Sequence, residues 1–124
     1  MLLSYTIRIM TNLDIAKAFS SGEFAKTYNF IAKDARWTVV EENSFVGKDA
    51  IIENCEEVAR YFKSVVTEFE NLSIIAEDNK VAIHGTAKFF RNDKLLSFVS
   101  ACDLYEFNDN NQIQNITSYC IPAK

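Results

Sequence analysis

The chain has 124 residues and a formal net charge of −4, and 48% of its residues are apolar or aromatic. This length predicts one domain, because two halves would each approach the size at which a hydrophobic core is hard to close. The composition excludes a disordered chain, and no apolar run approaches the roughly 20 residues of a membrane-spanning helix. With 13 Lys and Arg against 17 Asp and Glu, a surface for nucleic acid is not expected either.

The first ten residues are expected to be an N-terminal extension to a single domain over residues 11–124. They are apolar but contain Arg8, and they lack the charged leading region and cleavage site of a signal peptide. A cytoplasmic protein is therefore expected. Three widely spaced cysteines form no Cys-x-x-Cys motif, so we expect reduced thiols, no metal site and no cofactor. They are Cys55, Cys102 and Cys120.

The domain is expected to begin with two helices. Thr11 and Asn12 are good helix-capping residues, and apolar side chains then recur at helical spacing. Those positions are Ile15, Ala18 and Phe19. The pattern breaks over residues 20–22 and resumes in a second short helix that ends near residues 33–34. The apolar positions of this second helix are Phe24, Tyr28 and Ile31.

A strand and a third helix are expected next. Residues 36–43 place β-favouring side chains next to one another, which predicts a strand. Residues 45–47 are expected to form a short link. Apolar residues then recur at steps of three and four, which predicts an amphipathic helix over residues 48–65. Its apolar stripe consists of Ile51, Cys55, Val58, Phe62 and Val65.

The rest of the chain predicts four strands in an antiparallel meander. They are expected over residues 67–77, 81–90, 95–107 and 112–121, with a polar turn between each pair. Helices first and strands afterwards indicate the α+β class, because alternating β-α-β units would mix the two.

Alternation along residues 81–90 predicts which face of the sheet is buried. One face is apolar or small and is expected to point inward. It carries Val81, Ile83, Gly85, Ala87 and Phe89. His84, the one histidine, falls on the more polar face, where an ordinary surface position is expected. A catalytic triad or metal site built on histidine has no other histidine to use.

The strand over residues 95–107 is apolar on both faces, which is unusual for a sheet with one face in water. No helix is predicted after residue 66 to cover the second face. A second copy of the chain is the simplest cover, so we expect a homodimer formed partly through this outer face. The residues expected at its centre are Phe98, Cys102 and Leu104.

Asp103 is an anomaly in the same strand, because aspartate is poorly suited to strands and its neighbours on that face are mainly apolar. Two interpretations stay open. In the first, the carboxylate lies at a bulge or is satisfied by neighbouring donors. In the second, it points into an apolar cavity, where loss of water raises its pKa and leaves it protonated as a hydrogen-bond donor.

Three segments resemble the nuclear transport factor 2-like superfamily, which includes ketosteroid isomerases and SnoaL-like polyketide cyclases. Residues 22–35 are similar to the segment in which a Gly-Asp pair opens a helix that ends in Ala-Asp-Asp-Ala. Residues 46–51 resemble the entry to the third helix, and residues 104–113 resemble the final hairpin. The resemblance covers residues 11–121. It implies a cone-shaped fold in which helices precede a strongly curved antiparallel sheet.

The resemblance also implies candidate catalytic residues. Ketosteroid isomerases use an aspartate base, a tyrosine and a protonated aspartate, and their site is a known example of pKa tuning. Counted from the matching motifs, Asp103 occupies the position of the protonated aspartate. Val39 and Ile15 occupy the positions of the base and the tyrosine, so the full isomerase set is not present. Glu41 is a candidate replacement for the base if the first strand is bulged, and a solvated residue at the strand end otherwise.

The same count from the matching motifs predicts a mostly apolar pocket with a few polar groups, which is typical of small-molecule sites. Gly85 and Ala87 would leave room for a ligand; alternatively, Trp37 and the phenylalanines fill the space. The predicted lining is Ile15, Ile31, Trp37, Val39, Cys55, Ile83, Gly85, Ala87, Val99, Ala101, Asp103, Ile116, Ser118 and Cys120.

These observations leave two hypotheses for function. The leading one is a domain that binds a small hydrophobic molecule, with isomerase-like or cyclase-like proton transfer next to a carbonyl as its chemistry. The competing one is a non-catalytic module for dimerisation or protein association. A cavity lined by Asp103 would favour the first, and a filled core with a broad apolar outer face would favour the second.

Overall fold

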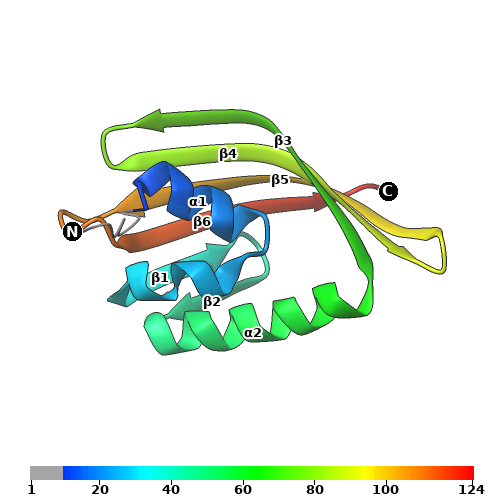
Figure 1. The fold of residues 1–124 in the computed structure, drawn as a ribbon, viewed down its shortest axis with the longest axis horizontal. Coiled ribbons are helices and arrows are strands. Elements are labelled where there is room, and N and C mark those ends of the chain that lie inside the picture. The colour runs from blue at the N-terminus through cyan, green and yellow to red at the C-terminus, as the bar shows by residue number, and fades with distance from the viewer. Residues whose placement is uncertain (1–9) are drawn as a thin grey trace, which may run out of the picture.

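A computed structural model describes residues 10–124 (Figure 1). The expected extension over residues 1–10 lies outside the described residues except for Met10. The elements in chain order are α1 (Asn12–Ser20), the 3-10 helix η1 (Phe24–Phe30), β1 (Ile31–Val39), β2 (Asn43–Val46), α2 (Lys48–Ser64), β3 (Val66–Glu77), β4 (Lys80–Arg91), β5 (Lys94–Phe107) and β6 (Ile113–Pro122). Within the described part of the chain, no helix is both long and apolar enough to cross a membrane.

The six strands form one sheet in the order β2-β1-β6-β5-β4-β3. The predicted meander is confirmed, because β3, β4, β5 and β6 each pair antiparallel with the next. β1 pairs parallel to β6, with Trp37 opposite Ile116, so the sheet is mixed at this point. The predicted α+β class, with helices before the meander, is confirmed.

α1 begins where the sequence predicted, because Thr11 caps it. Thr11 Oγ1 accepts a hydrogen bond from the Asp14 backbone N–H at 3.1 Å, and Asp14 Oδ2 accepts one from the Thr11 backbone N–H at 3.1 Å. This reciprocal capping box satisfies two donors that the helix start would otherwise leave free. The apolar side of α1 is buried against the sheet, and Ser20 at its end lies beside β5.

The second helix is shorter than predicted. It is a 3-10 helix that ends at Phe30, and the predicted helical end near residues 33–34 is wrong. β1 already begins at Ile31, which pairs with Ile113 on β6 and is 1% exposed. Pairing with a strand distant in the sequence outweighs the helical spacing, which is a local signal.

An unpredicted strand, β2, overlaps the predicted link over residues 45–47. The predicted first strand ends early, at Val39, and the chain turns at Glu41, whose φ of 65° is left-handed. β2 then returns antiparallel to β1 with Phe45 opposite Trp37. A strand of four residues is too short to show a periodic pattern in the sequence.

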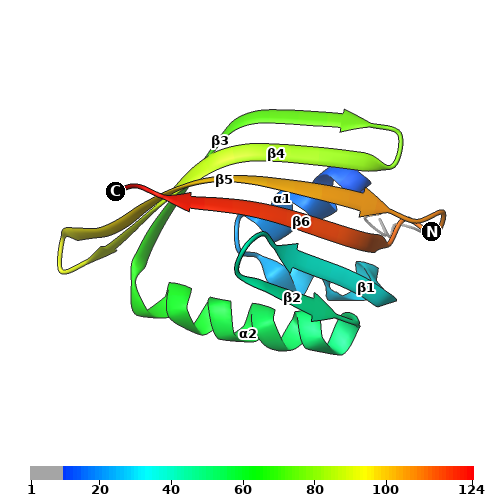
Figure 2. The same cartoon turned by 180° about the vertical axis from the view of Figure 1, so that it is seen from behind.

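The helices lie on one face of the sheet, which we call the inner face (Figure 1). α1 packs over β4 and β5, whereas α2 runs along β1 and β2 and reaches β3. The core lies between these layers and includes Ile15, Phe19, Ile51 and Tyr105. The opposite, outer face carries no helix from the described residues (Figure 2).

The predicted inward face of β4 is confirmed. Val81, Ile83, Ala87 and Phe89 are buried, and His84 is exposed on the other side. Residues directly opposite each other on paired strands point to the same side of the sheet. The register therefore shows which residues of β3 and β5 share the buried face of β4.

Gly85 allows β3 and β4 to approach each other closely. A Cβ at this position would lie 2.4 Å from the carbonyl oxygen of Glu70 on β3. The register between β3 and β4 shifts between Asn71 and Ser73, so β3 is bulged beside the glycine. The missing side chain lets the bulged backbone approach β4, which differs from the expectation that it leaves room for a ligand.

Candidate functional site

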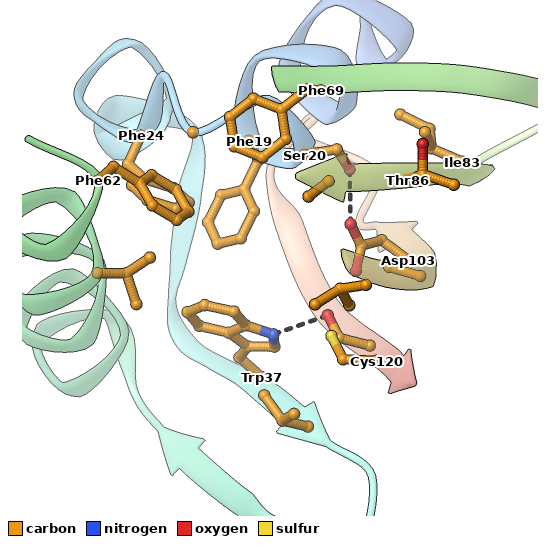
Figure 3. A pocket seen from close by; sticks show the side chains of 18 of the residues that line it. Phe19, Ser20, Phe24, Trp37, Phe62, Phe69, Ile83, Thr86, Asp103 and Cys120 are labelled. Carbon is orange, nitrogen blue, oxygen red and sulfur yellow. Dashed lines mark hydrogen bonds between the residues drawn. The ribbon is translucent and has the colours of Figure 1, made fainter. Parts of the chain in front are cut away.

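A cavity of about 580 Å³ lies between α1, α2 and the inner face of the sheet (Figure 3). This volume falls within the range of about 300–1,000 Å³ that is usual for small-molecule sites. Most of the predicted lining residues meet around it. They are Trp37, Val39, Ile83, Gly85, Ala87, Val99, Ala101, Asp103, Ser118 and Cys120.

The remaining predicted lining residues lie elsewhere. Ile15, Ile31, Cys55 and Ile116 are packed into the core behind the cavity, each at most 1% exposed. Burial raises the pKa of the Cys55 thiol to about 12, so it stays protonated at neutral pH. Glu41 is exposed in the turn after β1 and does not line the cavity. The structure therefore does not bring it to Asp103.

Asp103 is held at the cavity wall by hydroxyl groups. Ser20 Oγ, at the end of α1, donates a hydrogen bond to Asp103 Oδ2 at 2.8 Å. The Ser20 hydroxyl also lies 2.6 Å from the Tyr105 hydroxyl. Because the single Ser20 hydrogen is directed to Asp103, Tyr105 is the donor in this second bond. The chain Tyr105–Ser20–Asp103 links the core to the cavity.

A second chain of hydrogen bonds reaches Asp103 from β1. Trp37 Nε1 donates to Ser118 Oγ at 3.0 Å. Ser118 lies directly opposite Asp103 in the β5–β6 register, and its hydroxyl group lowers the pKa of the Asp103 carboxyl. An indole N–H can only donate, so the Ser118 oxygen accepts from Trp37 and its own hydrogen stays available to Asp103.

These surroundings change the acidity of Asp103. Burial raises the pKa of the carboxyl above its ordinary value of 3.8, and the nearby hydroxyl groups of Ser118, Ser20 and Tyr105 partly offset this rise. Loss of water disfavours the charged form, whereas donated hydrogen bonds favour it. The carboxyl therefore has hydroxyl neighbours and also lines the cavity, and both interpretations of Asp103 stay predictions.

Aromatic rings make up much of the remaining wall. The Phe19 ring packs edge-to-face against Trp37, with centroids 5.0 Å apart. On the α2 side, Phe62 stacks between Phe24 and Phe89, at centroid distances of 6.2 Å and 5.7 Å. The rings therefore line the cavity and leave space between the two groups (Figure 3).

Sequence reasoning missed several residues of the site. Ser20 lies in the predicted break after the first helix, and nothing local marks it as a partner of a residue on the fifth strand. Phe62 belongs to the predicted apolar stripe of α2, which gave a signal for burial but none for a cavity. Among residues 10–124, no group of three or more His, Cys, Asp or Glu is placed to hold a metal ion.

The helix order, the mixed sheet and the cavity define an α+β domain of the nuclear transport factor 2-like superfamily. The family model of the SnoaL-like domain matches residues 14–116. The chain belongs to the SnoaL-like family. No curated protein matches it.

Solved structures agree with this assignment. A nuclear transport factor 2-like protein of unknown function from Cytophaga hutchinsonii is 33% identical, with a TM-score of 0.79 over 88% of this chain and 95% of that chain. An LEH-like epoxide hydrolase from M. tuberculosis is 16% identical, with a TM-score of 0.67 over 89% of this chain and 82% of that chain. A candidate SnoaL-like polyketide cyclase from Jannaschia sp. CCS1 is 12% identical, with a TM-score of 0.68 over 96% and 91%. The last two likenesses show the fold alone.

Proposed function

We propose that this domain binds a small hydrophobic molecule that presents a carbonyl oxygen to Asp103. The observation that carries the proposal is a carboxyl group in a mainly apolar cavity, surrounded by hydroxyl donors and kept neutral more readily than an ordinary aspartate. A neutral carboxyl has one hydrogen to donate. Ser20 donates to Asp103 Oδ2, and Ser118 lies opposite the carboxyl, so the hydrogen of a neutral Asp103 is available to a ligand in the cavity.

The proposed chemistry is proton transfer next to that carbonyl. Asp103 can serve it in two ways. As a neutral acid, it donates a hydrogen bond to the carbonyl oxygen and stabilises the negative charge that develops there, while a solvent base takes the proton from the neighbouring carbon and returns it. As a carboxylate, it takes the proton from the neighbouring carbon and returns it to the same or another carbon. Both roles use the same position at the cavity wall.

Binding is tested with 4-acetylbiphenyl, a rigid apolar ketone, by calorimetry and by thermal shift. A ligand raises the melting temperature in proportion to the logarithm of its concentration over its Kd. We expect wild-type protein to bind the ketone more tightly than biphenyl, which lacks the oxygen. Asp103→Leu is expected to abolish this preference, and a preference that survives Asp103→Leu contradicts the proposed contact.

Reaction is tested by exchange of the acetyl hydrogens of the same ketone with deuterium from the solvent, followed by NMR. Asp103→Asn separates the two roles, because an amide donates a hydrogen bond but does not carry a proton as a carboxylate does. Loss of exchange with retained binding assigns proton transfer to Asp103. Exchange that persists in Asp103→Asn and is lost in Asp103→Leu assigns the hydrogen-bond role. Wild-type protein that binds without exchange limits the function to binding.

A second proposal concerns the outer face, which we expect to join two copies of the chain. The register places Ile75, Tyr119 and Ile121 on this face, and they are 68%, 49% and 67% exposed in the single chain. Its expected centre is Phe98, Cys102 and Leu104, of which none is charged.

A second copy is the occupant that the charges favour. Lys80 and Glu106, at one end of the outer face, form an ion pair of 3.8 Å within the chain. Lys88 lies over the Phe98 ring, 5.7 Å from its centroid. The outer face therefore carries charges of both signs beside its apolar residues, and a two-fold contact can bring a cation of one copy to an anion of the other. Light scattering at micromolar concentration is expected to give twice 14.1 kDa, and a mass equal to one chain contradicts the dimer.

We also propose a reducing, cytoplasmic environment. Support comes from Cys55, Cys102 and Cys120, which are all free thiols. Disulfides are common in oxidising compartments and rare in the cytosol. Thiol titration of protein isolated under alkylating conditions is expected to find three reduced cysteines; an isolated disulfide contradicts this proposal.

A further inference from the structure

α2 carries one polar side chain on its cavity side. Its apolar stripe contains Ile51, Cys55, Val58 and Phe62. Asn54 follows Ile51 by three residues and precedes Val58 by four, so it belongs to the same side of the helix. It is half-buried, and it lines the cavity. A carboxamide in such a stripe is unusual, because this side of an amphipathic helix normally carries apolar residues.

The Asn54 carboxamide has no hydrogen-bond partner among residues 10–124. α2 does pair a polar side chain elsewhere, since Tyr28 donates to Glu56 at 2.6 Å. A carboxamide offers two donor hydrogens and one acceptor oxygen. Asn54 is half-buried, so water reaches its carboxamide in the free protein. A ligand that displaces this water loses binding energy unless it offers Asn54 a hydrogen-bonding group in return.

Asn54 and Asp103 belong to opposite walls of the cavity. Asp103 lies on β5 under the end of α1, and α2 lies across the cavity, with Phe62 marking it in Figure 3. The surfaces between them are largely aromatic. No Lys, Arg or His among the described residues lines the cavity, whereas three acidic residues do. A carboxylate or phosphate would therefore enter without a cationic partner and against negative charge.

We propose that Asn54 is a specificity-determining residue that binds the far end of the ligand. The ligand class is then an uncharged, mainly apolar molecule with a hydrogen-bonding group at each end. One group faces Asp103 and the other faces Asn54. This inference rests on the proposed binding function, but it concerns a separate residue on a separate wall.

The test measures the binding of three ketones to wild type and three variants by calorimetry. The probes are 4-acetylbiphenyl and its 3′-hydroxy and 4′-hydroxy derivatives, which add a polar group at the far end. Wild type is expected to bind the better hydroxy derivative about three- to tenfold more tightly, the range for one neutral hydrogen bond. Asn54→Leu and Asn54→Asp remove the donors, whereas Glu53→Gln changes an exposed neighbour on α2 that does not line the cavity.

Asn54→Leu is expected to erase the preference for the hydroxy derivative, measured as the ratio of the two Kd values within that variant. Glu53→Gln is expected to keep the preference. A 4′-acetylbiphenyl-4-carboxylate probe is expected to bind more weakly than the parent ketone, and more weakly again to Asn54→Asp. In labelled wild-type protein, the Asn54 side-chain amide signals are expected to shift with the hydroxy derivative.

Several outcomes overturn the inference. A preference that is the same in wild type and Asn54→Leu, or amide signals that do not move, removes Asn54 from the site while 4-acetylbiphenyl binding still supports the role of Asp103. Tighter binding of the carboxylate contradicts the uncharged ligand class. Failure of every probe to bind wild type overturns this inference together with the proposed function. Circular dichroism of each variant verifies that it is folded.

Discussion

The two faces of β5 differ in what covers them within the described part of the chain: the inner face lies under the helices, and the outer face does not. Asp103 points to the inner side, where Ser20 donates to it and a ligand-sized cavity opens in front of it. Cys102 and Leu104, its immediate neighbours in the chain, belong to the outer side, which no helix from the described residues covers. The polar residue is thus enclosed by its own chain, and the apolar ones are not.

This difference teaches that polarity alone does not assign the faces of a sheet. The inner face tolerates a carboxyl because hydroxyl groups satisfy it, as buried polar groups require. The outer face keeps apolar residues in contact with water in the single chain, among them Ile75 and Ile121, which supports the proposed contact with a second copy. The following substitutions test each half of the comparison.

The largest effect is expected from a charge on the outer face. Ile121→Asp places a carboxylate on a side chain that is 67% exposed in the single chain, so folding of the monomer is expected to be retained. In the dimer, an unpaired charge would be buried at the contact. Sedimentation equilibrium is expected to show weaker dimerisation, with the Kd of the dimer raised by more than about 100-fold.

The control for this effect is Leu13→Glu. Leu13 is also an exposed apolar residue, but it lies on α1 over the inner face. Its substitution is expected to leave the dimer intact. Equal dissociation in both variants, or no dissociation in Ile121→Asp, contradicts an interface on the outer face.

The next effect concerns the inner face, where Gly85 permits the bulge of β3. Gly85→Ala forces a Cβ toward the Glu70 carbonyl oxygen, and one of the two strands must move. Overpacking of this kind costs about 1–3 kcal/mol of unfolding free energy. Urea denaturation measures the loss, with Thr86→Ala on the same strand as the control. A stable Gly85→Ala protein would mean that the bulge adjusts without cost.

The effect of pH on stability is expected to follow Asp103. The pKa of its carboxyl is raised in the folded protein by burial, above the ordinary value of 3.8. At pH values between the pKa of the unfolded state and the raised pKa of the folded state, the folded state binds more protons than the unfolded state. The stability that Asp103 contributes therefore falls as pH rises through this range. Asp103→Asn lacks this loss.

Urea denaturation of wild type and Asp103→Asn across pH 3–8 isolates this contribution, because the other carboxylates are common to both proteins. The difference in unfolding free energy is expected to shift in favour of Asp103→Asn as pH rises above about 4. A difference that stays constant, or shifts in favour of wild type, would show an aspartate with an ordinary or lowered pKa.

The smallest effect is expected from the second chain of hydrogen bonds. Ser118→Ala removes a donor to the Asp103 carboxylate and is expected to raise the pKa of Asp103 further. Trp37→Phe leaves Ser118 without its fixed donor and is expected to cause a smaller rise. NMR titration of the carboxyl measures both. An unchanged pKa in Ser118→Ala removes Ser118 from the control of Asp103.

Much of the architecture could be predicted from local patterns. The stripe of α2 and the alternation of β4 are periodic over many residues, and both were placed correctly. The helix limit near residues 33–34 and the strand β2 were not, because each depends on pairing with a distant or very short partner. Local periodicity contains no information about such partners.

The candidate site, like the fold, could be predicted only where a local pattern marks the residue. Asp103 could be singled out because an acid in an apolar strand is conspicuous in the sequence. Ser20 and Asn54 could not be singled out, because each is an ordinary residue for its own helix. Only the three-dimensional structure shows that Ser20 contacts Asp103 and that Asn54 lines the cavity. Gly85 was placed on the correct face, yet the reason for its small size lies in the backbone of β3.

The central claim is that Asp103 binds its ligand in the neutral form, and one titration tests it directly. The carboxyl carbon of Asp103 is followed by NMR against pH, with and without 4-acetylbiphenyl. The account predicts a pKa above 3.8 in the free protein and a further rise when the ketone is bound, because a ligand that binds the protonated form stabilises it. A pKa at or below 3.8, or one that the ketone lowers, would contradict the account.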